Sequence, residues 1–118
     1  MEKSPVERVD KPWGHELVWA LTDSYAGKTL FVRAGESLSL QYHRTKEETL
    51  HLLSGRVRLE VGPSEKELRV VELSVGESIH LPPGTVHRLE ALDDVRILEV
   101  STPHLEDVVR LEDRYGRA

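Results

Sequence analysis

The sequence predicts an all-β protein, an antiparallel sandwich or barrel built as one domain. Short turn signals recur along the chain, and the runs between them alternate apolar and polar residues, as half-buried strands do. These turn signals lie at residues 34–36, 54–56, 61–66, 82–84 and 92–94. A chain of 118 residues is long enough for one such domain with a real core. We expect an extension at 1–10, a barrel at 11–101 and a closing segment at 102–118.

The strand predictions rest on alternation. Val57, Leu59 and Val61 alternate with charged residues, which predicts a half-buried strand, and residues 29–32 and 95–100 are predicted as strands of a packed sheet. The stretch from 37 to 43 alternates too, so apolar side chains would occupy one face and Gln41 and His43 the other. Residues 104–114 are the one helix candidate.

The helix prediction comes from spacing near the end of the chain. Leu105, Val108 and Val109 are spaced as on one face of a helix, and Pro103 would stand near its start. A short C-terminal helix over His104–Arg114 is therefore expected beside the barrel.

Composition excludes several classes of function. No cysteine is present, which excludes disulfides and thiolate metal sites. The net charge of −5 argues against nucleic acid or an anionic membrane as the main partner. No apolar run approaches ~18 residues and no signal peptide is visible, so we expect a cytoplasmic protein without a membrane span.

Two segments carry regularly spaced potential metal ligands. The first reads Gly35, five residues, Gln41, one residue, His43, four residues, Glu48, six residues, Gly55. The second reads Gly76, five residues, Pro82, one residue, Gly84, two residues, His87. Two imidazoles, a carboxylate and an amide oxygen suit one divalent ion with open positions for substrate. Zn, Mn, Ni, Co and Fe all fit such a set.

The spacing of these segments resembles the two sequence motifs of the cupin superfamily. In the first motif, Gln41 stands where a histidine is usual, and the spacing to Gly55 favours Glu48 over Glu47 as the carboxylate. In the second motif, Ala91 stands at the usual asparagine position. The resemblance implies a double-stranded β-helix, the cupin jelly roll, with a metal bound by Gln41, His43, Glu48 and His87 inside the barrel.

Further segments are similar to the mannose-6-phosphate isomerase-like cupins, in particular the type II phosphomannose isomerase domain. They are KPWG at 11–14, LSLQYH at 38–43, LPPGTVHRL at 81–89 and the tail at 107–117. The likeness extends over residues 9–117. It implies a metal-dependent enzyme that isomerises an aldose and a ketose, with a phosphosugar or related sugar as its small-molecule partner.

Three positions depart from that group. Where the type II isomerases usually carry a histidine, an arginine and a histidine, this chain has Thr45, Lys46 and Thr49. Lys46 keeps the positive charge without the planar fork that suits phosphate. Two alternatives therefore stay open: a non-catalytic, metal-dependent sugar- or metabolite-binding module, and an Fe-dependent oxygenase using two histidines and one carboxylate.

The remaining candidates concern substrate and proton transfer. The residues proposed to hold an anionic group are Arg33, Lys46, Arg88 and Lys28. Lys46, His51 and His80 are the candidate catalytic residues, and a metal-bound hydroxide is another possible base. For each charged candidate the alternative is a solvated surface residue. We also expect a homodimer, because small jelly rolls leave open sheet edges that pairing can cover.

Overall fold

The computed structural model describes residues 1–117, and within that range the chain is all β, as predicted. The strands are β1 (Glu7–Lys11), β2 (Gly14–Leu21), β3 (Ala26–Val32), β4 (Leu40–Tyr42), β5 (Glu48–Ser54), β6 (Val57–Gly62), β7 (Arg69–Leu73), β8 (Ser78–Leu81), β9 (Val86–Ala91), β10 (Val95–Ser101) and β11 (Val109–Glu112). No helix occurs in these residues, so none that could cross a membrane is present among them.

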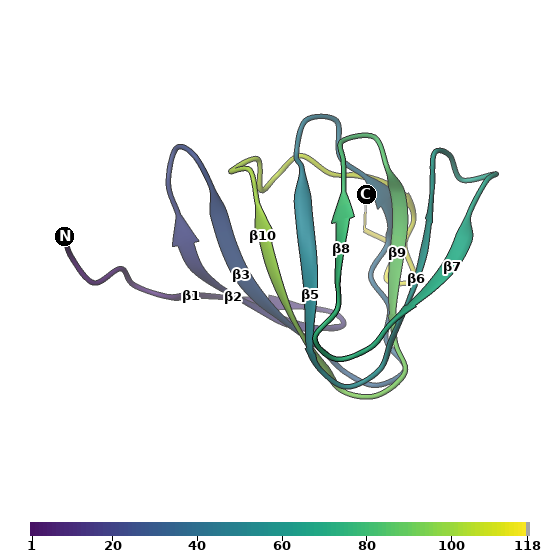
Figure 1. The fold of residues 1–118 in the computed structure, drawn as a ribbon, viewed down its shortest axis with the longest axis horizontal. Coiled ribbons are helices and arrows are strands. Elements are labelled where there is room, and N and C mark those ends of the chain that lie inside the picture. The colour runs from purple at the N-terminus through teal and green to yellow at the C-terminus, as the bar shows by residue number, and fades with distance from the viewer. Residues whose placement is uncertain (118) are drawn as a thin grey trace.

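The strands form two antiparallel sheets that face each other. The first sheet has six strands in the order β1-β2-β3-β10-β5-β8, and the second has five in the order β11-β4-β9-β6-β7. The chain crosses from one sheet to the other after β3, β4, β5, β7, β8, β9 and β10, which is the jelly-roll arrangement. Figure 1 shows the first sheet running across the molecule from β1 to β8, with β9, β6 and β7 beyond it.

Strand register decides which side chains share the inner surface. In the pairing of β10 with β3, Glu99 lies opposite Lys28 and Ile97 opposite Leu30. Since side chains alternate along a strand, all four of these residues point between the sheets. The inner surface is therefore charged at the pair of Lys28 and Glu99 and apolar at the next inward pair, Leu30 and Ile97.

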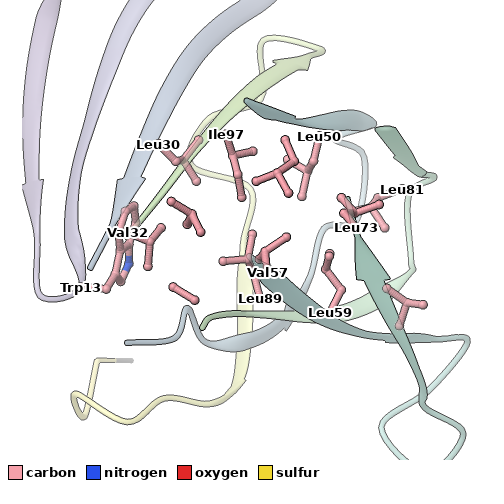
Figure 2. Packing of buried hydrophobic residues seen from close by; sticks show 14 residues of the cluster. Trp13, Leu30, Val32, Leu50, Val57, Leu59, Leu73, Leu81, Leu89 and Ile97 are labelled. Atoms are coloured by element: carbon pink, nitrogen blue, oxygen red, sulfur yellow. The ribbon is translucent and has the colours of Figure 1, made fainter. Parts of the chain in front are cut away.

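The hydrophobic core fills one half of the space between the sheets. Figure 2 shows Leu30, Ile97 and Leu50 of the first sheet facing Val57 and Leu89 of the second. We call the end where Val32, Val57, Val95 and Ala91 pack the closed end of the barrel. Burial of this apolar surface is the main favourable term for folding.

A glycine fixes the turn between β5 and β6 at the closed end. Gly55 has a φ of 89°, which glycine adopts without strain. A Cβ atom at this position would lie 2.4 Å from the carbonyl oxygen of Asp94. The glycine that follows the predicted ligand Glu48 in the motif is thus required by the backbone.

The predicted C-terminal helix is wrong, because Val109–Glu112 form strand β11 instead. β11 pairs with β4, where Val109 lies opposite Tyr42 and Arg110 opposite Gln41. The three-residue strand β4 would otherwise leave backbone groups unpaired along the sheet edge, and an added strand satisfies them. Val109 and Leu111 also fit strand alternation, so the tertiary pairing decides between the two patterns.

Candidate metal centre

The four predicted ligands come from three neighbouring parts of the barrel. Gln41 lies on β4, His43 directly follows it, and His87 lies on β9, opposite Gln41 in the β4–β9 pairing. Glu48 begins β5 in the other sheet, so its carboxylate reaches the two histidines from across the barrel. The jelly-roll topology thus joins residues far apart in sequence, and we call this region the open end.

Three of the four residues form a compact, buried triad. The donor atoms of His43, Glu48 and His87 all lie within 4.8 Å of one another. His43 Nε2 is 3.4 Å from Glu48 Oε2, and His87 Nε2 is 3.7 Å from Glu48 Oε1. These separations leave room for an ion among the three groups.

Each imidazole is oriented by a backbone carbonyl. The Nδ1 of His87 donates to the carbonyl oxygen of Thr85 at 2.9 Å, and the Nδ1 of His43 donates to that of Asp107. A carbonyl only accepts, so the proton resides on Nδ1 and the lone pair of Nε2 faces the carboxylate. Both Nε2 atoms are buried and have no hydrogen-bond partner among the described residues. This is the arrangement that a metal ion would complete.

Gln41, the fourth predicted ligand, lines the same cavity as the triad. Its side chain is half-buried. Its Oε1 accepts a hydrogen bond from Ser39 Oγ at 3.0 Å. An amide oxygen has two lone pairs, so one remains for a neutral oxygen ligand. The donor set therefore fits one divalent ion.

The protonation states at the triad suit metal binding. Burial lowers the pKa of His87, which favours the neutral, ligating imidazole. Burial alone would favour neutral Glu48, but the Lys46 cation holds the pKa of that carboxyl well below its usual range. An ionised carboxylate thus faces a neutral imidazole.

Lys46 lies inside the barrel, bridging two carboxylates. Its Nζ is 2.9 Å from Glu48 Oε2 and 2.9 Å from Glu99 Oε2. Burial opposes the charge of Lys46, but the attraction of Glu99 and Glu48 raises its pKa, so it stays a cation. The loop that carries it is clamped by Asp107, whose carboxylate accepts from the amides of Arg44, Thr45 and Lys46 at 3.1, 2.7 and 2.9 Å.

A row of alternating charges continues away from the triad. Lys28 Nζ lies 3.7 Å from Glu99 Oε2 and 3.0 Å from Glu16 Oε2. Sequence reasoning named Lys28 and Lys46 but missed Glu16 and Glu99. The alternation of β10 held a signal, because Glu99 is in phase with the apolar Val95 and Ile97. A charged residue at an inward position of a strand indicates a partner or a ligand.

These side chains surround a cavity of about 310 Å³. The triad, Gln41, Lys46, Lys28, Glu16 and Glu99 all line it. The cavity is also lined by the first two strands and the closing segment, a region that we call the outer part, where the lining cations are Lys11, Arg110 and Arg117. Arg117 is held by Asp113 through bonds of 2.9 and 3.0 Å. The site thus combines a metal position with a charged chamber.

Four of the predicted site residues lie outside the cavity lining. His51 bonds to Ser78 Oγ at 2.8 Å on the outer face of the first sheet. His80 is exposed and pairs with Glu47. Arg88 points out of the second sheet to Glu60, and Arg33 donates to the carbonyl oxygen of Pro12. Alternation explains three of these positions, since His51, His80 and Arg88 are out of phase with their buried neighbours.

Solved structures share this fold at low sequence identity. KdgF from a Halomonas species has a TM-score of 0.72 and 21% identity, covering 86% of this chain and 91% of that one. Oxalate decarboxylase of Bacillus subtilis, studied for its Mn(II) centers, has a TM-score of 0.76 and 20% identity, covering 89% of this chain and 30% of that one. These likenesses show the fold, the cupin jelly roll.

Sequence relatives are more specific. The mannose-1-phosphate guanylyltransferase ManC of Salmonella typhimurium is 34% identical over 114 residues, 92% of this chain and 23% of the relative. The xanthan biosynthesis protein XanB of Xanthomonas campestris is 30% identical over 93% of this chain and 24% of the relative. The chain spans about a quarter of the length of these curated relatives. The family model described as mannose-6-phosphate isomerase C-terminal matches residues 2–113, and the chain belongs to that family.

Proposed function

We propose that this chain is a metal-dependent enzyme that interconverts the aldose and ketose forms of a phosphosugar. The observation that carries the proposal is the buried triad of His43, Glu48 and His87, which opens onto a cavity lined by further charged side chains. The family match and the sugar-phosphate chemistry in the names of the relatives support this substrate class. The Mn(II) centers of a structural neighbour make manganese one of the ions to test.

Different residues would bind the metal ion and stabilise the negative charge that develops in such a reaction. A divalent ion bound by Gln41, His43, Glu48 and His87 would supply a Lewis acid for the sugar carbonyl and its neighbouring hydroxyl. Lys46, fixed as a cation between two carboxylates, adds positive charge where an enediolate would form.

The outer part of the cavity would receive the phosphate. Lys11, Arg110 and Arg117 line this part, whereas the sequence candidates Arg33 and Arg88 lie outside. Guanidinium groups form paired hydrogen bonds with phosphate oxygens. We therefore assign the phosphate to the side of the cavity lined by the closing segment.

The test is interconversion of mannose 6-phosphate and fructose 6-phosphate, followed by NMR on metal-loaded protein. Wild type should convert one into the other, His87→Ala should lose both metal and activity, and the exposed His80→Ala should retain both. Metal-loaded wild type that binds these sugars without converting them would overturn the isomerase and leave a sugar-binding module.

An oxygenase is the second candidate, favoured by the two histidines and one carboxylate of the triad. Oxygen uptake by Fe(II)-loaded protein with a candidate sugar would establish it. Uptake unchanged by His87→Ala would show that the triad is not responsible.

The homodimer stays a prediction, supported by open sheet edges. β1 and β8 end the first sheet, and β7 and β11 end the second, so each has an unpaired side in the described chain. Val70 on β7 is also exposed. Light scattering at micromolar concentration should give twice the chain mass of 13.4 kDa, and a monomeric mass would contradict the prediction.

A further inference from the structure

Glu99 is a buried acid of the cavity that the metal site does not use. It lies on β10 with 4% of its surface exposed and lines the cavity. Its Oε2 is 2.9 Å from Lys46 Nζ and 3.7 Å from Lys28 Nζ. That atom is enclosed and makes these ion-pair contacts without a hydrogen bond of good geometry, while the residue itself borders the cavity.

Stability does not explain this carboxylate. Burying ionised groups is costly even when they are paired, and apolar residues of similar volume often serve as well. Val95 and Ile97 fill the equivalent inner positions of the same strand. Glu99 stands where β10 borders the cavity, which indicates a functional role for its carboxylate there.

The positions of the candidate side chains also favour Glu99. His51 and His80 lie outside the cavity lining, and Glu48 is assigned as a metal ligand. Of the other lining acids, Glu16 is bonded to Lys28, and Glu7 and Glu106 are exposed at the outer part. Glu99 is the acid joined to the triad through a single lysine nitrogen, because Lys46 contacts both Glu48 and Glu99.

We propose that Glu99 is the general base of this site, a catalytic residue that rests on the proposed isomerase function. Its carboxylate takes the proton from C2 of the open-chain aldose phosphate, while the C–H electrons form the C1–C2 double bond and the carbonyl electrons move to O1. The resulting acid delivers a proton to C1 after partial exchange with solvent, and the hydroxyl proton moves from O2 to O1. Atoms and charge balance without a further reactant.

The surroundings of Glu99 suit this task. Lys46 and Lys28 hold the carboxylate from two sides. Burial, together with the nearby Glu48, raises the pKa of Glu99, which makes its carboxylate a stronger base. Lys28 is fixed in turn by Glu16 at 3.0 Å, so Glu16 is a positioning residue one step further from the chemistry.

The test compares Glu99→Gln and Glu16→Gln with wild type, using mannose 6-phosphate in D₂O. Exchange of the C2 proton, read by NMR, should fall by at least ~100-fold in Glu99→Gln, whereas metal content and mannose 6-phosphate binding stay at wild-type levels. Glu16→Gln should slow exchange by less than ~10-fold, because it acts only through Lys28. Glu99→Asp keeps a carboxylate but moves it farther from the substrate, so its exchange rate should lie between those of wild type and Glu99→Gln.

The outcomes separate this inference from the proposed function. Wild-type exchange in metal-loaded Glu99→Gln would overturn the base assignment and leave the isomerase standing. Loss of metal together with activity in Glu99→Gln would also overturn it, since Glu99 would then support the triad. If Glu99→Gln does not fold, an unreduced rate in Glu99→Asp overturns the assignment. Metal-loaded wild type that neither exchanges nor converts the sugar removes both proposals.

Discussion

The two ends of the barrel interior are built from the same strands with opposite chemistry. On β3 the inward side chains change from Val32 and Leu30 to Lys28, and on β10 they change from Ile97 to Glu99. On each strand the change occurs between two inward residues that are two positions apart. A jelly roll can therefore carry its hydrophobic core and its charged site on the same strands, at different positions along them.

Different forces hold the two ends. At the closed end, apolar side chains such as Leu52 and Leu59 are wholly enclosed and contribute through the hydrophobic effect. At the open end, buried charges offset one another, and such pairs add little net stability. We therefore expect substitutions at the closed end to change stability, and those at the open end to change metal binding and chemistry.

The largest expected effect is on stability, from Leu52→Ala at the closed end. Leu52 is fully enclosed, so its truncation should lower the free energy of unfolding by about 2–5 kcal/mol, measured by urea denaturation. The metal content of the folded protein should stay unchanged. The next residue, Leu53, points outward, and Leu53→Ala should cost less than ~0.5 kcal/mol. Equal costs at the two positions would contradict the assigned core.

His87→Ala should have the next largest effect, on metal binding. Loss of a ligand should weaken metal affinity by more than about 100-fold. That value is the upper end of the loss expected when only a residue that supports a ligand is removed. The metal-free protein should lose only about 1 kcal/mol, for the bond to Thr85. Metal titration by calorimetry checks the first value and denaturation the second. A stability loss like that of Leu52→Ala would show that the two ends are not separable.

Gln41→Ala should have a smaller effect on metal affinity. A water molecule can replace a neutral amide oxygen, so affinity should fall by about 10-fold. The matched control is Ser39→Ala, which removes the hydroxyl that bonds to Gln41 and leaves the amide in place. Unchanged affinity in Gln41→Ala would mean that the amide is not a ligand.

The smallest effect is a pH dependence that traces to Asp107. Three backbone amides lower the pKa of this carboxyl from 3.8 to about 2, so the folded protein favours its ionised form. The stabilisation is therefore complete above about pH 4 and is lost as pH falls towards about 2. Melting temperatures of wild type and Asp107→Asn should differ most at neutral pH and converge in acid. A constant difference across this range would contradict the assignment.

Local sequence patterns predicted several of the strands and the three residues of the triad. Alternation predicted the strands at 57–61 and 95–100, and motif spacing brought together His43, Glu48 and His87, which the structure places within ligand distance of one another. Such predictions succeed because a strand's inward face follows from its own sequence.

The predictions that failed or were missing depend on partners in other strands. The C-terminal helix gave way to β11 because β4 offered an edge. The row from Glu16 through Lys28 to Glu99 depends on β2, β3 and β10 lying side by side, an order that no single strand encodes. The sequence-based candidate bases lay close to the ligands along the chain, whereas the proposed base Glu99 lies on β10, a more distant strand.

The closing segment has a consequence for the order in which the molecule is completed. Asp107 orients His43 and clamps the loop carrying Lys46, and β11 then covers the edge of β4. These residues follow all the other strands in chain order. On the ribosome the hydrophobic core can therefore assemble first, while His43 stays unoriented until residue 107 has emerged. We therefore expect the candidate metal site to form only after the closing segment has been synthesised.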